Sequence, residues 1–134
     1  MRLTDLGMRI RLLLLIITAI TIVSCNGARK SETFRVLEDV DSYIEARPDS
    51  ALAVLEGIDV EDLGSREEKA KYALLMSMAL DKNYIDRTDF EVLQPAIDYY
   101  EDYGSATDKL RTFYYQGRIY CNRGESEEAM ECLI

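Results

Sequence analysis

The sequence predicts an all-α fold for most of its 134 residues. Apolar residues recur at three- and four-residue steps, which is the period of an amphipathic helix. At two expected helix starts Ser or Thr is followed three residues later by Glu, a capping-box pattern that opens helices. Gly and Pro separate the periodic segments, and strand signals are scarce. We therefore expect about six helices joined by short turns and packed as antiparallel pairs.

The first 24 residues are of a different kind. Arg2, Arg9 and Arg11 precede an apolar run of about twelve residues over 12–23. A transmembrane helix needs roughly 20 such residues, so the run fits the hydrophobic region of a signal peptide better. Basic residues before the run hold the N-terminus in the cytoplasm and direct the following chain across the membrane. We assign residues 1–24 to a signal peptide.

The apolar run ends in Ile22-Val23-Ser24-Cys25. A branched apolar residue, a variable one and a small one before cysteine resemble the lipobox of bacterial lipoproteins. The resemblance implies cleavage before Cys25 and lipidation of its thiol. An Asp directly after the lipidated cysteine would resemble an inner-membrane retention signal, but this chain has Asn26 there. The resemblance therefore also implies an outer-membrane anchor facing the periplasm. The alternative is a plain thiol at the end of a membrane helix. We expect residues 25–31 to be a polar tether.

The helical pattern occupies residues 32–134. The expected helices cover residues 32–46, 48–58, 65–80, 88–103, 105–124 and 125–134. Ser65 with Glu68 and Thr88 with Glu91 are the two capping-box patterns. Pro95 falls inside the fourth range, where it would remove a hydrogen bond at a cost of about 3 kcal/mol. That helix is therefore either kinked at Pro95 or begins near Leu93.

The last two helices carry a repeat. An aromatic residue, a small residue, a tyrosine, a second small residue and an apolar residue follow at fixed steps: Phe113, Gly117, Tyr120, Ala129 and Leu133. This spacing resembles the tetratricopeptide repeat, in which the small residues mark the close crossing of two paired helices. The resemblance implies that residues 32–134 form a short solenoid of about three helix pairs, the last one incomplete. A generic array of helical hairpins is the alternative.

Two residues depart from the repeat pattern. Gln116 occupies a position where Leu is usual, and Asp39 stands where the first unit should have a small residue. The repeat is therefore degenerate in its earlier units. An interruption between the helices of the second unit predicts a long loop across residues 81–87.

The tetratricopeptide resemblance also implies a partner-binding surface. In such arrays the first helix of each pair lines the concave face. This register places two sets of residues toward the groove: Glu67, Ala70, Leu74 and Met78 in the second unit, and Arg111, Tyr114, Arg118 and Asn122 in the third. Arg and Tyr are enriched at binding hot spots, so we assign partner binding to the second set. An ordinary solvated helix face is the alternative.

Charge and composition restrict the classes of function. Residues 25–134 hold 13 basic and 24 acidic side chains, a net charge of -11, which argues against nucleic-acid binding. The chain has no His, the commonest general base and metal ligand. We therefore expect no catalytic residue, metal or cofactor. Cys121 and Cys132 are either two separate packing thiols or, in an oxidising compartment, a disulfide.

The sequence stops within an amphipathic segment at Ile134. Solenoids need polar terminal caps, so we expect an array that continues further or self-association through the last helix. Our hypothesis is a membrane-anchored periplasmic lipoprotein that acts as a protein- or peptide-binding scaffold. The alternative is the N-terminal sensory input part of a longer tetratricopeptide membrane sensor-regulator. A third hypothesis, an enzyme that uses paired carboxylates, has no defined cleft to support it.

Overall fold

The computed structural model describes residues 3, 6–13 and 31–134. The chain divides into two units, residues 1–30 and 31–134, and each is described by itself. In the first unit, residues 6–13 are helical and exposed. The apolar run from residue 14 onward, Cys25 and residues 26–30 of the tether lie outside the described residues. Within the part of the chain that is described, no helix has the length and apolar character that crossing a membrane requires.

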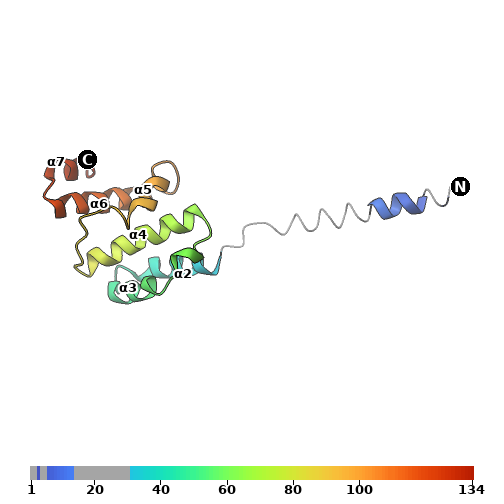
Figure 1. Cartoon of the computed structure of the whole chain (residues 1–134), viewed down its shortest axis with the longest axis horizontal. Coiled ribbons are helices and arrows are strands. Elements are labelled where there is room, and N and C mark those ends of the chain that lie inside the picture. Colours follow the sequence, from blue (N-terminus) through green and yellow to red (C-terminus); the bar gives the residue numbers. More distant parts are fainter. Residues whose placement is uncertain (1–2, 4–5, 14–30) are drawn as a thin grey trace. The chain divides into compact units, whose positions relative to one another are not determined.

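Residues 31–134 are all-α, as predicted, and hold no strand (Figure 1). The α-helices are α2 (Glu32–Tyr43), α3 (Pro48–Glu56), α4 (Arg66–Lys82), α5 (Gln94–Tyr100), α6 (Ala106–Arg123) and α7 (Ser126–Glu131), with a short 3₁₀ helix, η1 (Val60–Asp62). Helix α4 lies between α2 and α3 on one side and α5 and α6 on the other, and α7 packs on α6. Each helix thus contacts the helix that follows it or the next but one.

The capping box predicted at Ser65 and Glu68 is confirmed. Ser65 Oγ accepts a hydrogen bond from the Glu68 backbone N–H at 3.1 Å, and the Glu68 carboxylate accepts from the Ser65 and Gly64 N–H groups. Glu68 also accepts a hydrogen bond from the hydroxyl of Ser31, whose Oγ caps α2 by accepting from Phe34 N–H. Ser31 therefore belongs to the folded unit, one residue earlier than the helical region we expected.

The capping box predicted at Thr88 and Glu91 is wrong. Asp89 accepts the hydrogen bond from the Glu91 N–H, and residues 83–93 form a loop. Helix α5 begins only at Gln94, so that Pro95 lies in its first turn, where a missing N–H costs nothing. Of the two alternatives for Pro95, the later helix start is therefore correct.

Helix α4 is the centre of the core. Its buried apolar residues are Ala70, Ala73, Leu74, Leu75, Met76, Met78 and Ala79. They face both neighbouring groups of helices, which explains why α4 shows little amphipathic character. By contrast, Asp39 on α2 is exposed, while Leu37 and Val40 are buried. The repeat register that we assigned to Asp39 is therefore wrong, because that position meets no crossing helix.

The close approach predicted at Gly117 and Ala129 is confirmed. A Cβ placed on Gly117 would lie 3.3 Å from the Ala129 carbonyl oxygen and 3.3 Å from Cys132 Cβ. A side chain at Gly117 would therefore push α7 away from α6. Gly124, the cap of α6, has a φ of 78° and so reverses the chain into α7 at low conformational cost.

Candidate binding groove

Helix α6 has two apolar faces that serve different purposes. One face is buried against the preceding helices and holds Thr112, Tyr115 and Ile119. The other holds Leu110, Phe113 and Tyr114, which are 70%, 47% and 45% exposed. Since the spacing i, i+3, i+4 places these three side chains together, α6 presents a contiguous apolar surface to solvent. This second face forms one wall of a groove.

We call this feature the α4–α6 groove. It has a volume of about 780 Å³ and receives residues from the turn after α2, from α4 and α6, and from the end of α7 with the segment after it. Its apolar lining consists of Met78, Leu110, Phe113, Tyr114, Tyr115, Cys132, Leu133 and Ile134. Its volume falls in the upper part of the range of ligand pockets. The groove is large enough to take several apolar side chains of a ligand.

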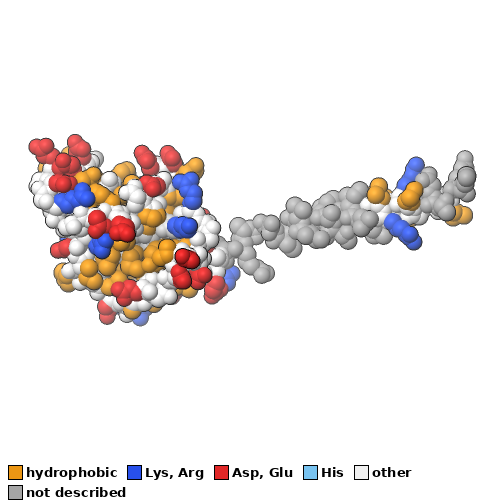
Figure 2. All heavy atoms as spheres, viewed as in Figure 1, with side chains coloured by type: hydrophobic (Ala, Val, Ile, Leu, Met, Phe, Trp, Pro, Cys, Tyr) orange, Lys and Arg blue, Asp and Glu red, His pale blue; other side chains and the backbone are white. Residues whose placement is uncertain are grey.

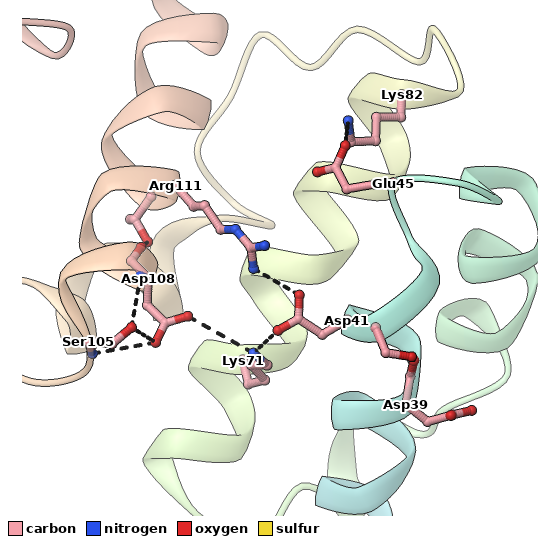
Figure 3. Close-up of polar contacts among 10 residues, drawn as sticks. Asp39, Asp41, Glu45, Lys71, Lys82, Ser105, Asp108 and Arg111 are labelled. Carbon is pink, nitrogen blue, oxygen red and sulfur yellow. Dashed lines mark hydrogen bonds and ion pairs between the residues drawn. The ribbon is translucent and has the colours of Figure 1, made fainter.

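The charged residues at the groove are largely paired within the protein. Lys82 Nζ lies 2.6 Å from Glu45 Oε2, and both residues line the groove (Figure 3). Asp81 accepts a hydrogen bond from Arg118 Nε at 2.9 Å. Glu131, which is exposed, has no ion-pair or hydrogen-bond partner through its carboxylate among the described residues. The unpaired charge among the lining residues is therefore negative.

Asp41 connects three helices beside the groove. Its carboxylate pairs with Lys71 of α4 and accepts a hydrogen bond from Arg111 Nη1 of α6 at 2.8 Å (Figure 3). Lys71 Nζ also lies 4.0 Å from Asp108 Oδ1. Burial raises the pKa of Asp41, but Lys71 and Arg111 outweigh that effect and hold the pKa below its usual value. Asp41 therefore stays ionised and fixes α6 against α2 and α4.

The four predicted partner-binding residues divide into two pairs. Arg111 and Tyr114 line the α4–α6 groove. Arg118 and Asn122 instead line a separate cavity of about 20 Å³, where Asn122 Nδ2 donates to the Arg87 carbonyl at 3.0 Å. The Asn122 contact holds the loop of residues 83–93 against α6, whereas Arg118 ties α6 to α4 through Asp81. Only Tyr114 of the four has an exposed side chain without a polar partner among the described residues.

The second-unit residues that we expected to face the groove do not all do so. Ala70 and Leu74 are wholly buried in the core, so they present no surface to a ligand, and our expectation for them is wrong. Met78 lines the groove but is only 1% exposed. Sequence reasoning missed Leu110 and Phe113. Their i, i+3, i+4 spacing with Tyr114 is visible in the sequence, but that spacing does not tell an exposed apolar face from one that another helix covers.

Among the described residues, no group of three or more His, Cys, Asp or Glu side chains is arranged to hold a metal ion. Cys121 and Cys132 are free, so of the two alternatives for them the structure shows separate thiols. Burial raises the pKa of the Cys132 thiol, which lowers its nucleophilicity.

The surface of residues 31–134 is strongly acidic. This unit carries 11 Lys and Arg against 24 Asp and Glu, a net charge of -13. Figure 2 shows acidic side chains spread around hydrophobic surface, with the fewer basic side chains among them. Comparison of the chain with protein-family models, with curated proteins and with solved structures gives no match.

Proposed function

We propose that this protein is a lipid-anchored scaffold of the bacterial cell envelope whose helical unit binds a segment of a partner protein in the α4–α6 groove. The observation that carries the proposal is the exposed apolar wall of that groove. Leu110, Phe113 and Tyr114 expose apolar surface in one place, which a soluble domain tolerates where a partner covers it. Tyrosine at the centre of such a surface is typical of a binding hot spot.

The repeat architecture supports this role. Consecutive helices contact one another along the chain, and α6 and α7 meet closely at the two small residues Gly117 and Ala129. We propose that α2 with α3, α4 with α5 and α6 with α7 are antiparallel pairs of a short tetratricopeptide-like solenoid. In this arrangement α2, α4 and α6 are the first helices of their pairs. The groove receives Glu45 from the turn after α2, Met78 from α4 and Tyr114 from α6, as a concave face would.

The anchor rests on the sequence around Cys25. The signal peptide over residues 1–24, followed directly by Cys25, resembles that of lipoproteins, and acyl chains on Cys25 would hold the unit at the membrane. We propose an outer-membrane location with the helical unit facing the periplasm. A tether of five residues, 26–30, would then separate the lipid from Ser31.

The anchor is tested by labelling producing cells with an alkyne analogue of palmitate. The wild-type chain should incorporate the label, and Cys25→Ala should not. A Cys121→Ser/Cys132→Ser variant keeps Cys25 and should be labelled as strongly as wild type. Equal labelling of the wild type and Cys25→Ala would remove the lipoprotein proposal.

The groove is tested separately by affinity capture from envelope extracts. Tyr114→Ala should lose a partner that the wild type retains, because truncating a hot-spot tyrosine costs roughly 2 kcal/mol or more. Tyr84→Ala is the matched control, since Tyr84 is exposed and does not line the groove. If both variants retain the same proteins as the wild type, the groove is not the binding surface.

A further inference from the structure

We infer that the ligand of the α4–α6 groove is a basic amphipathic helix, with an apolar stripe against Leu110, Phe113 and Tyr114 and with Lys or Arg beside that stripe. This inference rests on the proposed function and specifies the chemistry of the partner segment. Three observations carry it: the apolar lining of the groove, the internal pairing of the basic side chains at the groove, and the net charge of residues 31–134.

The apolar lining of the groove requires a ligand whose backbone hydrogen bonds are made within the ligand itself. Met78, Leu110 and Phe113 offer no hydrogen-bonding group, and an unpaired peptide N–H or C=O buried against them would cost free energy. The polar side chains at the rim do not fill this need, because Lys82 and Arg111 already bond to Glu45 and Asp41. The described residues 31–134 also hold no strand edge to pair with an extended peptide. A helix bonds its own backbone internally and is the conformation that this groove accepts.

The charge of the unit selects a basic helix. The two basic residues that line the groove, Lys82 and Arg111, are neutralised by carboxylates. Glu131 is unpaired at the groove, and Glu127 and Glu128 are exposed on the same short helix. Residues 31–134 have a net charge of -13. Lys or Arg beside the apolar stripe would be attracted to this surface, which accelerates association and excludes acidic segments.

The same charge disfavours a second copy of the helical unit as the occupant. Two such units would bring like net charges of -13 together. An anionic membrane surface would be repelled for the same reason. The partner segment is therefore expected to come from another protein.

The test uses the full chain and three labelled peptides of about 18 residues, long enough to form a helix of several turns. The first peptide has Leu at positions i, i+3, i+4 and i+7 with Lys elsewhere. The second has Glu in place of Lys, and the third keeps Lys but has Ser in place of Leu. Affinities are measured by fluorescence anisotropy at low and high salt, since screening weakens exposed charge interactions.

The Leu/Lys peptide should bind at least about tenfold more tightly than either other peptide, with an affinity that falls as salt rises. Leu110→Ala/Tyr114→Ala should weaken it by about tenfold or more, while the control Tyr84→Ala/Met130→Ala, at two residues that are also exposed but lie outside the groove, should not. Glu131→Lys should weaken it by about fivefold. Glu61→Lys changes the net charge equally on η1, away from the groove, and should have a smaller effect.

Other outcomes overturn the inference in distinguishable ways. Equal binding of the Lys and Glu peptides, lost in Leu110→Ala/Tyr114→Ala, would keep the groove as the site and remove the preference for a basic partner. Binding that is unchanged by Leu110→Ala/Tyr114→Ala would contradict the proposed groove as well. Dimers of the full chain in analytical ultracentrifugation that this double variant dissociates would assign the groove to a second copy.

Discussion

Asp41 Oδ1 accepts a hydrogen bond from Arg111 Nη1 at 2.8 Å, although the two residues are 70 positions apart in the chain. The same carboxylate pairs with Lys71, so one side chain of α2 holds both α4 and α6 (Figure 3). This contact determines how α6, and therefore Leu110 and Tyr114, are presented at the groove. It leads to the first prediction.

Asp41→Asn should lower the free energy of unfolding by about 2 kcal/mol, because it leaves two partly buried cations without their carboxylate. Urea denaturation at neutral pH measures the change. Asp39→Asn is the matched control, since Asp39 lies on the same helix, is exposed and points away from Lys71 and Arg111 (Figure 3). Equal losses in the two variants would show that Asp41 has no special role.

Glu68 should make the stability of the helical unit depend on acid pH. The Ser31 hydroxyl and the Gly64 and Ser65 N–H groups hold the pKa of Glu68 below its usual value of 4.5, although burial opposes them. The folded state then binds fewer protons than the unfolded state, so this stabilisation is complete above about pH 5 and is lost as the pH falls below 4.5.

Glu68→Gln should therefore be less stable than the wild type at pH 6, and its stability should fall less between pH 5 and pH 3. The measurement is the urea midpoint across this range. Asp41 also has a lowered pKa and contributes part of the wild-type decrease. An unchanged slope in Glu68→Gln would show that Glu68 is not protonated differently in the folded and unfolded states.

Gly117→Cys should form a disulfide with Cys132. The new Cβ would lie 3.3 Å from Cys132 Cβ, close to the 3.5–4.5 Å that disulfides use. In a Cys25→Ser/Cys121→Ser background, mild oxidation should remove both free thiols and make this variant about 3 kcal/mol more stable than its own reduced form, for a loop of about 15 residues. Thiol titration with mass spectrometry measures the bond.

Gly57→Cys in the same background is the control for this disulfide. Its Cβ would meet only the carbonyl oxygens of Ala53 and Val54, so it should keep both thiols. Intramolecular oxidation of Gly57→Cys at the same rate would mean that α6 and α7 are not specifically close at Gly117.

Tyr84→Gly should raise the free energy of unfolding by about 1 kcal/mol. Tyr84 has a φ of 60°, and its backbone closes the end of α4 in the way that Gly124 closes α6. The tyrosine side chain is 93% exposed, so little packing is lost with it. Tyr84→Ala retains the steric strain and should give no such gain in thermal unfolding. A similar gain in Tyr84→Ala would refute the conformational explanation.

The helix ranges and the close packing at Gly117 could be predicted because local signals determine them. The Ser65 capping box and the two small residues of the last pair needed no knowledge of distant contacts. The capping box at Thr88 failed because nearby Asp89 supplies the acceptor and because Pro95 favours a later start.

The sequence predicted only some of the groove residues, because packing between distant parts of the chain decides which residues line the groove. Arg118 has the residue type of a hot spot, but Asp81 from α4 already engages it. Ala70 and Leu74 are buried because α4 is covered on both sides, and the weak amphipathic pattern of α4 is the sequence signal that the groove assignment overlooked. Leu110 and Phe113 follow helical spacing, yet only the folded unit shows that no other element covers them.

Site-specific photo-crosslinking in producing cells tests the central claim most directly. Replacing Tyr114 by p-benzoylphenylalanine puts a reactive ring in the α4–α6 groove, and the same replacement at exposed Tyr84 puts one outside it. Irradiation should link the chain to a discrete partner protein from position 114 and not from position 84. No adduct at position 114, or the same adducts at both positions, would contradict a partner-binding groove.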